Sequence, residues 1–339
     1  MLTNVTTISD VARAAGVSTA TVSRALNRHA TVDPALAARV LEAAETLGYR
    51  PNALARSLRQ KKTSVWALII SDIGNPFFTA IARGVEDVAQ QNGFSVILCN
   101  ADEDAGKESQ YLGVAQQEQV AGVILSPHSS TTDTSSLVGA SIPLVAIDRK
   151  LDQPVDTVLV NSREGARAAT SHLLDEGWTR PACITGPLDA DTAVQRQQGY
   201  DDALAARGLS AQSMVRRDVF RQEAGRAAAA SLLDAPVAPD AFFVANSNLA
   251  LGALAECAAR GIRIGTDVGL IAFDDAPWAQ FIDPPISVVT QPAYEIGAKA
   301  ARLLVERIAG RRTVAPEDTV LPTELILRAS SRRGVRSTQ

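Results

Sequence analysis

The chain contains two hydrophobic patterns, and the longer one begins near residue 64. Wholly apolar runs recur there at intervals, and helix-period stretches such as residues 78–92 and 105–118 lie between them. Apolar strands that alternate with helices are typical of parallel sheets covered on both faces. The predicted strands are residues 65–70, 95–99, 122–125, 143–147 and 157–160, followed by 181–186, 241–245, 268–273 and 286–289.

These strands form two series along about 275 residues, which is more than one hydrophobic core usually holds. We therefore predict an α/β body at residues 64–333 with two subdomains, each a doubly wound parallel sheet. The N-subdomain covers about residues 64–161 and 292–320, the C-subdomain covers about 162–291 and 321–333, and residues 334–339 form a tail. Ligands of open α/β sheets bind beyond the carboxyl ends of the strands, and a cleft between two such sheets faces both sets.

A shorter pattern fills residues 1–50 and predicts an all-α helix-turn-helix head. Thr7 and Asp10 cap a first helix, Gly16 ends it in the left-handed conformation, and Ser18 caps a second helix. The outward face of the second helix carries short hydroxyls and one guanidinium, which suit a major groove and its phosphates. This face comprises Thr19, Ala20, Thr21, Ser23 and Arg24. By periodicity alone, the pair also fits an ordinary surface hairpin of helices.

A third helix and a hinge follow. Asp33 and Pro34 provide a cap and a first-turn proline, and Gly48 ends the helix. Its apolar stripe, which is expected to close a small core, is Leu36, Val40, Leu41, Ala44 and Leu47. Residues 51–63 then predict one short hinge helix with a basic tail. Because so short a helix is unstable alone in water, we expect it to fold when two copies meet on DNA.

The two parts of the chain carry opposite net charge. Through Lys62 there are nine Lys or Arg and four Asp or Glu residues, a net +5, and the remainder carries −9, giving −4 for the whole chain. A basic head attracts phosphate and an acidic body repels it, so DNA contact is expected at the head alone.

Polar and aromatic side chains follow the predicted strands of the body. Asp72-x-x-Asn75-Pro76-Phe77-Phe78 follows the first strand, Asp148-Arg149 follows the fourth, and Asn246 and Asp274-Asp275 follow strands of the second series. Arg196 lies after another strand of that series. Carboxylates, an amide, a guanidinium and aromatic faces suit a polyhydroxylated ligand. The sequence lacks the Gly-rich loop that phosphate sites place at a helix start.

Two motifs at this spacing resemble the lactose/galactose-repressor family of transcription factors, and the likeness covers nearly the whole chain. They are Val17-Ser18-x-x-Thr21-Val22-Ser23-Arg24-x-Leu26-Asn27 and Pro51-Asn52-x-x-Ala55-x-x-Leu58. The resemblance implies that base edges are read by Thr19, Ala20 and Arg24, and that phosphates are contacted by Thr21, Ser23 and Asn27. It also implies a DNA-contacting hinge helix with Asn52, Ala55 and Leu58. Leu58 would wedge into the minor groove, unless it is a surface leucine packed on the head.

The same resemblance implies a body similar to periplasmic sugar-binding proteins. It aligns Asn246, Asp274 and Arg196 with effector-contacting positions. Aromatic walls are assigned to Phe77, Phe78 and Phe220, and further contacts to Asp148, Trp278 and Gln291. Ser247 departs from the family, which usually has Asp there. Simpler roles stay open: Asp274 or Asp275 as a helix cap, Trp278 in the core, and Arg196 facing a surface carboxylate.

Several classes of protein are disfavoured. The three cysteines, Cys99, Cys183 and Cys257, are far apart and fit buried free thiols in a reducing cytoplasm. No metal-ligand spacing, cofactor motif, leader or membrane-length apolar run is present, so we expect no metal, no cofactor and no membrane contact.

The sequence therefore predicts a cytoplasmic, sequence-specific transcriptional regulator, a repressor that binds a palindromic operator in double-stranded DNA as a homodimer. A small effector, a sugar or related metabolite in the cleft between the subdomains, is expected to control it. No leucine heptads follow the body, so a tetramer is not expected. Two further classes are less favoured: an enzyme using the Asp148 and Asp274 carboxylates, for which no catalytic motif is found, and a sugar-binding module without regulation. The effector, the operator and the sign of regulation stay open.

Overall fold

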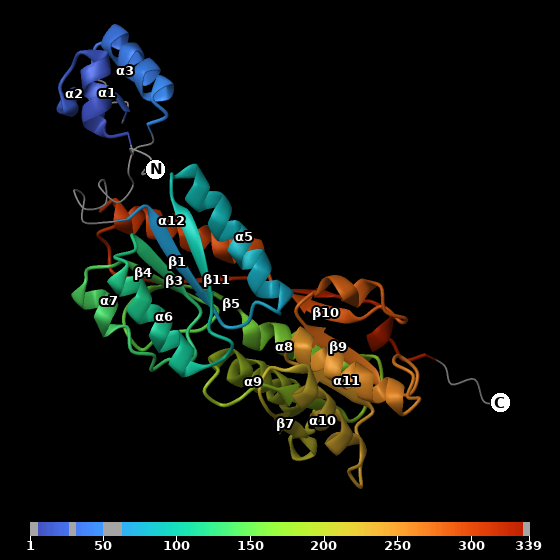
Figure 1. The fold of residues 1–339 in the computed structure, drawn as a ribbon. Coiled ribbons are helices and arrows are strands. Elements are labelled where there is room, and N and C mark those ends of the chain that lie inside the picture. Colours follow the sequence, from blue (N-terminus) through green and yellow to red (C-terminus); the bar gives the residue numbers. More distant parts are fainter. Residues whose placement is uncertain (1–5, 27–31, 50–62, 335–339) are drawn as a thin grey trace. The chain divides into compact units, whose positions relative to one another are not determined.

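The computed structural model describes residues 6–26, 32–49 and 63–334, and the chain forms two compact units, residues 1–63 and 64–339 (Figure 1). Asn27, Asn52, Ala55 and Leu58 lie outside the described residues. The described part of the first unit, the head, consists of α1 (Ile8–Ala15), α2 (Thr19–Leu26) and α3 (Pro34–Thr46).

The predicted helix ends of the head are confirmed. The Asp10 carboxylate accepts hydrogen bonds from the backbone N–H of Thr7 at 2.9 Å and from its hydroxyl at 2.7 Å. Gly16 follows α1 with φ +64°, a conformation that glycine adopts without strain. The Asp33 carboxylate accepts from the first backbone N–H groups of α3. Capping therefore sets these boundaries.

The core of the head is smaller than the predicted stripe. Val11, Val22 and Val40, one from each helix, are completely buried. The prediction was wrong for Leu41 and Leu47, which are 50% and 37% exposed. The reason is size: two short helices cover only a narrow strip of α3.

The body contains two six-stranded sheets (Figure 1). The first sheet comprises β1 (Val65–Ile70), β2 (Ser95–Asn100), β3 (Gly122–Leu125), β4 (Leu144–Ile147), β5 (Asp156–Val160) and β11 (Asp318–Leu321). The second comprises β6 (Pro181–Thr185), β7 (Val215–Arg217), β8 (Ala241–Val244), β9 (Gly269–Phe273), β10 (Ser287–Thr290) and β12 (Glu324–Ile326). The first has the order β11-β5-β4-β3-β1-β2 and is parallel throughout, and the second has the order β12-β10-β9-β8-β6-β7, with only β12 antiparallel. The predicted α/β class is confirmed.

Helices bury both faces of each sheet. The first sheet lies between α5 (Pro76–Gln91) with α12 (Ala293–Ile308) and α6 (Ala105–Gln117) with the short α7 (Ser135–Gly139). The second lies between α8 (Ser162–Asp175) with α9 (Asp191–Ala205) and α10 (Gln222–Leu233) with α11 (Ser247–Ala259). Three short 3-10 helices complete this region: η1 (Ser210–Gln212), η2 (Pro277–Gln280) and η3 (Ala329–Ser331).

The α5–α12 contact depends on glycine. A Cβ on Gly84 would lie 2.2 Å from the backbone oxygen of Tyr294, and one on Gly297 would lie 2.1 Å from that of Ile81. Only glycine allows the two helices to approach this closely, and α12 begins directly after the chain leaves β10.

The chain passes between the sheets after β5, β10 and β11. Strands β7, β11 and β12 were not predicted, because these short sheet-edge strands lack a wholly apolar run.

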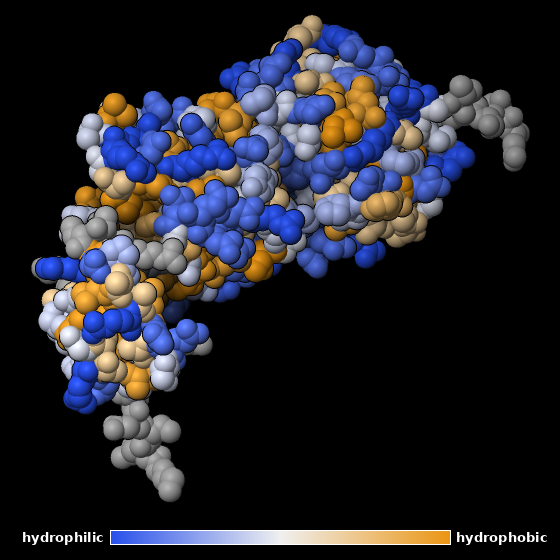
Figure 2. All heavy atoms as spheres, turned by 90° about the horizontal axis from the view of Figure 1, so that it is seen from above, coloured by the Kyte–Doolittle hydropathy of each residue, from blue (hydrophilic) through white to orange (hydrophobic). Residues whose placement is uncertain are grey.

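In the view of Figure 2, hydrophilic side chains cover much of the body, with apolar patches between them. Within the described ranges, no helix has the length and apolar character needed to span a bilayer.

Candidate functional site

The candidate site lies at the carboxyl ends of the strands of both sheets, where open α/β proteins bind ligands. A cavity of about 20 Å³ is present there, enough for about one water molecule. The loops of the first sheet and the start of α5 supply Asp72, Asn75, Phe77, Phe78, Glu103, Asp148 and Arg149. The loops of the second sheet and α9 supply Thr192, Arg196, Phe220, Asn246, Asp274 and Gln291.

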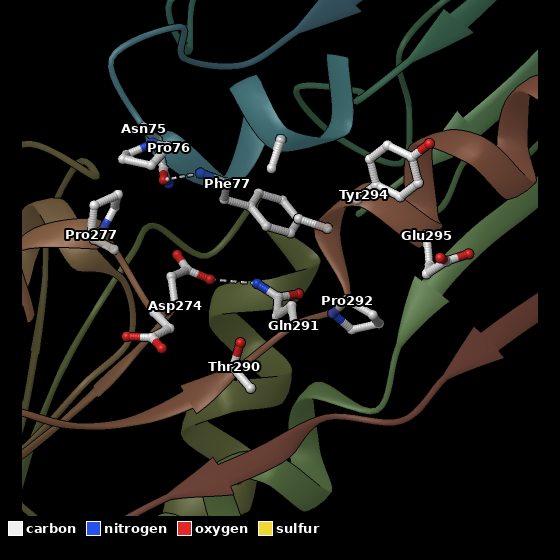
Figure 3. A pocket seen from close by; sticks show the side chains of 14 residues that line it. Asn75, Pro76, Phe77, Asp274, Pro277, Thr290, Gln291, Pro292, Tyr294 and Glu295 are labelled. Atoms are coloured by element: carbon white, nitrogen blue, oxygen red, sulfur yellow. Dashed lines mark hydrogen bonds between the residues drawn. The ribbon is translucent and has the colours of Figure 1, made fainter. Parts of the chain in front are cut away.

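A larger hollow of about 410 Å³ opens beside this cavity and shares Asn75, Phe77, Asp274 and Gln291 with it (Figure 3). Its other walls are Pro76, Ala80, Asp275, Ala276, Pro277, Thr290, Pro292, Ala293, Tyr294 and Glu295. In Figure 3, the Asp274 and Gln291 side chains point toward each other near the Phe77 ring. A ligand that reaches the cavity from this hollow must therefore pass these three side chains.

Two aspartates occupy equivalent places in the two sheets. Asp148 follows β4 and Asp274 follows β9, and their backbone N–H groups donate to Val158 at 3.0 Å and Val289 at 2.9 Å. Both then turn into the left-handed region, with φ +66° and +75°. Aspartate tolerates this conformation better than most residues, and such backbone is concentrated at functional sites. The turn brings both carboxylates to the cavity.

Two buried arginines face these carboxylates. Arg149 donates to both oxygens of Glu103, at 2.9 and 2.7 Å, which fixes the plane of its guanidinium. Arg196 donates to the Ala245 carbonyl at 2.7 Å and lies 3.9 Å from the centre of the Phe273 ring. Protein contacts therefore fix one side of each guanidinium group.

Three buried polar atoms at this cavity have no hydrogen-bond partner among the described residues. They are the Nε atoms of Arg149 and Arg196 and the Oε1 atom of Gln291, whose Nε2 donates to Asp274. A carboxylate oxygen of Asp148 lies 3.6 Å from the Arg149 Nε, beyond hydrogen-bond distance. Leaving such groups unbonded costs stability, so their presence beside a cavity marks a place for a polar ligand. Two donors, one acceptor and two carboxylates can bind several hydroxyl groups at once.

Burial dominates the electrostatics of the two aspartates. It raises the pKa of Asp148 from 3.8 to about 6, although Arg149 and Arg196 act in the opposite direction. Burial likewise raises the pKa of Asp274, against the effect of Arg196. The two arginines are outnumbered by four carboxylates, those of Asp72, Glu103, Asp148 and Asp274, so the site carries no excess positive charge.

The raised pKa predicts a pH-dependent stability. A carboxyl group with a raised pKa stabilises the folded protein at low pH, and this contribution is lost as the pH rises through about 6. The wild type should therefore lose about 2 kcal/mol of unfolding free energy relative to Asp148→Asn between pH 4 and pH 7. Urea titrations of both proteins at several pH values measure this difference. A difference that does not change with pH would show that the carboxyl group is solvated.

The structure gathers most of the predicted effector residues at the cavity. Phe77, Phe78 and Phe220 line it, and the first two rings meet edge to face with centroids 5.0 Å apart. Trp278 lines neither the cavity nor the hollow; it is half-buried and packs against the core of the second sheet, the simpler role that its sequence position allowed. Asn246 also caps α11 by accepting from the Leu249 N–H at 2.8 Å.

Asp274 and Arg196 do not take the simpler roles considered for them. Asp274 bonds to Gln291 and does not cap the following η2 helix, which begins after Ala276. Arg196 is buried and does not face a surface carboxylate. Both side chains therefore belong to the cavity.

Five further residues line the cavity that were not predicted as effector contacts: Asp72, Asn75, Glu103, Arg149 and Thr192. Asp72, Asn75 and Arg149 stand within the strand-end motifs and could have been chosen from them. Glu103 lies in the loop after β2 and gave no signal, because its role depends on a partner 46 residues away.

In the head, the described residues of α2 show which side chains are accessible. Thr19, Ala20 and Arg24 are exposed, while Val22 and Ala25 pack inward. Thr21 and Ser23 are half-buried, and the Thr21 N–H donates to the Ser18 hydroxyl at 3.1 Å. The exposed face therefore includes the three side chains predicted to read bases.

Comparison with known proteins agrees with both units. A family model described as bacterial regulatory proteins, lacI family, matches residues 7–52, and a periplasmic binding protein-like domain matches residues 170–331. The ribose operon repressor of Halalkalibacterium halodurans is 37% identical over 335 residues, which cover 98% of this chain and 99% of that protein.

Solved structures agree with this assignment. A complex of the transcriptional regulator CelR with cellobiose has 34% identity and a TM-score of 0.72, covering 96% of this chain and 99% of that one. A LacI family transcriptional regulator from Enterococcus faecium with bound ribose has 27% identity and a TM-score of 0.72, covering 78% and 98%. With its helix-turn-helix head and two-sheet body, the chain belongs to the lacI family of bacterial regulatory proteins.

Proposed function

We propose that the protein is a transcriptional repressor whose operator binding is controlled by a neutral pentose of the ribose type. The observation that carries the proposal is the convergence of Asp148, Arg149, Arg196 and Asp274 on one small cavity. Relatives named for the ribose operon and a related regulator with bound ribose support the choice of sugar.

The chemistry of the site suits a small neutral sugar. The Asp148 and Asp274 carboxylates accept bonds from hydroxyl groups, and the unbonded Nε atoms of Arg149 and Arg196 donate to ring or hydroxyl oxygens. The aromatic faces of the three phenylalanines cover the C–H surfaces of the sugar. Since no positive charge is in excess, a phosphate or carboxylate on the ligand would meet carboxylates without compensation.

The size of the cavity implies movement. Small-molecule pockets commonly have volumes of ~300–1,000 Å³, far above the 20 Å³ found here. The two sheets must therefore separate to admit a sugar, and a pentose needs less space than a disaccharide. The three chain passages between the sheets are the places where this motion is expected.

We further propose that two copies bind a palindromic operator through the head, with the hinge helix at residues 51–63. Strand β2 is an edge strand with Ile97 51% exposed and Leu98 38% exposed. Exposed apolar edge strands are normally covered by pairing or packing, which supports a second copy there. A regulator of this kind acts in the cytoplasm, and no catalytic reaction or resident cofactor is proposed.

The control is a coupling between two sites. A sugar that binds one orientation of the two sheets better than another shifts the population toward it, and the head and hinge adjoin the N-subdomain in sequence. A difference of about 1–3 kcal/mol between the binding free energies of the sugar for the two orientations changes operator affinity about five- to 150-fold. The sign, induction or corepression, depends on the orientation that the sugar prefers.

Calorimetry with sugars tests the proposal. We expect D-ribose to bind and to change operator affinity, and D-ribose 5-phosphate to bind at least about tenfold more weakly because its charge is not compensated. Cellobiose serves as the comparison for size. Tighter binding of the phosphate ester or of cellobiose would contradict a neutral pentose effector.

A further inference from the structure

Three polar contacts cross the cleft at the margin of the small cavity, and we call them the rim contacts; of their six residues, Asp72 also lines the cavity. Asn248 at the start of α11 donates from Nδ2 to the Asp72 carboxylate at 2.9 Å. Arg221 pairs with Asp102 at 3.3 Å, and His128 lies 3.5 Å from Asp189. In each pair one residue follows a strand of the first sheet and the other belongs to the second, so separating the sheets must break all three contacts.

Of the three rim contacts, the Asn248–Asp72 bond is expected to stabilise the closed cleft most. Both side chains are half-buried, and a hydrogen bond to a carboxylate is stronger than one between neutral groups. The Arg221–Asp102 pair has side chains 55% and 35% exposed, where ion pairs contribute little. His128 and Asp189 have side chains 24% and 52% exposed and are separated by a longer distance.

We propose that Asn248 is a positioning residue that sets how tightly the cleft holds its effector, without touching it. Asn248 does not line the cavity, whereas its neighbour Asn246 does. The bond to Asp72 forms only when the two sheets are close, so it stabilises the closed cleft equally for every sugar. The neighbouring Ser247, whose hydroxyl lies 3.5 Å from the Asn75 amide oxygen, adds no charge at this junction. The inference rests on the proposed function only in taking a pentose as the effector.

The first test uses Asn248→Leu, which keeps the size of the side chain and removes its donor. We expect D-ribose to dissociate about three- to tenfold faster, and weaker-binding pentoses to dissociate faster by the same factor. Arg221→Ala is the matched control and should change the rates less than about twofold. If the dissociation rate rises by a different factor for each sugar, Asn248 contacts the ligand. If the rates do not change, the bond does not hold the cleft closed. Either result overturns the proposal.

A reciprocal exchange separates positioning from a merely structural role. In the double variant Asp72→Asn with Asn248→Asp, the new amide donates to the new carboxylate, so the slow dissociation should return. Asp72 also lines the cavity, so Asp72→Asn alone should speed sugar dissociation at least as much as Asn248→Leu. If the double variant releases sugar as fast as the single ones, the pair does not act through this bond.

A distance measurement keeps the inference separate from the choice of sugar. Cysteines introduced at Val138 and Val237, which are 68% and 63% exposed on the two halves of the body, can carry spin labels because the three native cysteines are buried. Asn248→Leu should shift the distance distribution toward larger separations without any sugar. If D-ribose fails to bind but this shift is seen, the proposed ligand is wrong and the role of Asn248 stands. An unchanged distribution overturns that role.

Discussion

Replacing Asp274 with asparagine is expected to weaken effector binding about tenfold to a hundredfold while operator binding without sugar stays unchanged. The carboxylate is buried at the cavity, where it is the natural acceptor for sugar hydroxyls and the partner of Gln291. Asparagine tolerates the φ of +75° at this position, so the backbone should keep its conformation. Titration calorimetry with D-ribose measures the loss.

Asp275→Asn is the matched control for this experiment. Asp275 is the next residue, but it pairs with Arg328 at 2.7 Å and does not line the small cavity. Its replacement should leave sugar affinity within about twofold, because the ion pair that it removes lies outside the small cavity. Equal losses in both variants would mean that local stability, and not ligand contact, explains the effect of Asp274.

Replacing Arg24 with alanine is expected to weaken specific operator binding about fivefold to a hundredfold and to relax sequence preference at one position of each half-site. Arg24 is exposed on α2, the second helix of the head, and a bidentate contact to guanine contributes ~1–3 kcal/mol of discrimination. Fluorescence anisotropy with operator variants, measured at fixed salt concentration, gives both quantities.

Arg13→Ala provides the control, since it removes the same charge from α1. The Arg13 side chain is 79% exposed and pairs with Asp10 at 3.2 Å. Its loss should reduce specific and nonspecific binding alike, through the salt-dependent electrostatic part. If Arg24→Ala also lowered both by the same factor, Arg24 would contact phosphates and would not read a base.

Local signals in the sequence predicted much of the fold. The caps at Thr7 and Asp33 and the glycine after α1 mark helix ends because they satisfy backbone groups within a few residues. Buried parallel strands are also recognisable in the sequence, because both of their faces must be apolar. The edge strands β7, β11 and β12 were not predicted, because pairing with one neighbouring strand, and not local composition, defines them.

The candidate site was predictable only in part. Parallel strands bring their carboxyl ends to one edge, so residues such as Asp148, Asn246 and Asp274 could be grouped from their positions after strands. Trp278 satisfied the same rule, yet its ring packs against the core, because position after a strand does not determine where a side chain points.

By itself, then, the sequence determined the head, the alternating α/β body and the strand ends that carry the polar groups, because each is encoded by neighbours along the chain. Only the tertiary structure decided which of these groups meet. The pairing of Arg149 with Glu103, the 20 Å³ cavity and the bond from Asn248 to Asp72 join segments 46 to 176 residues apart. Such contacts depend on side-chain directions and on distances between packed sheets, which follow from the whole fold.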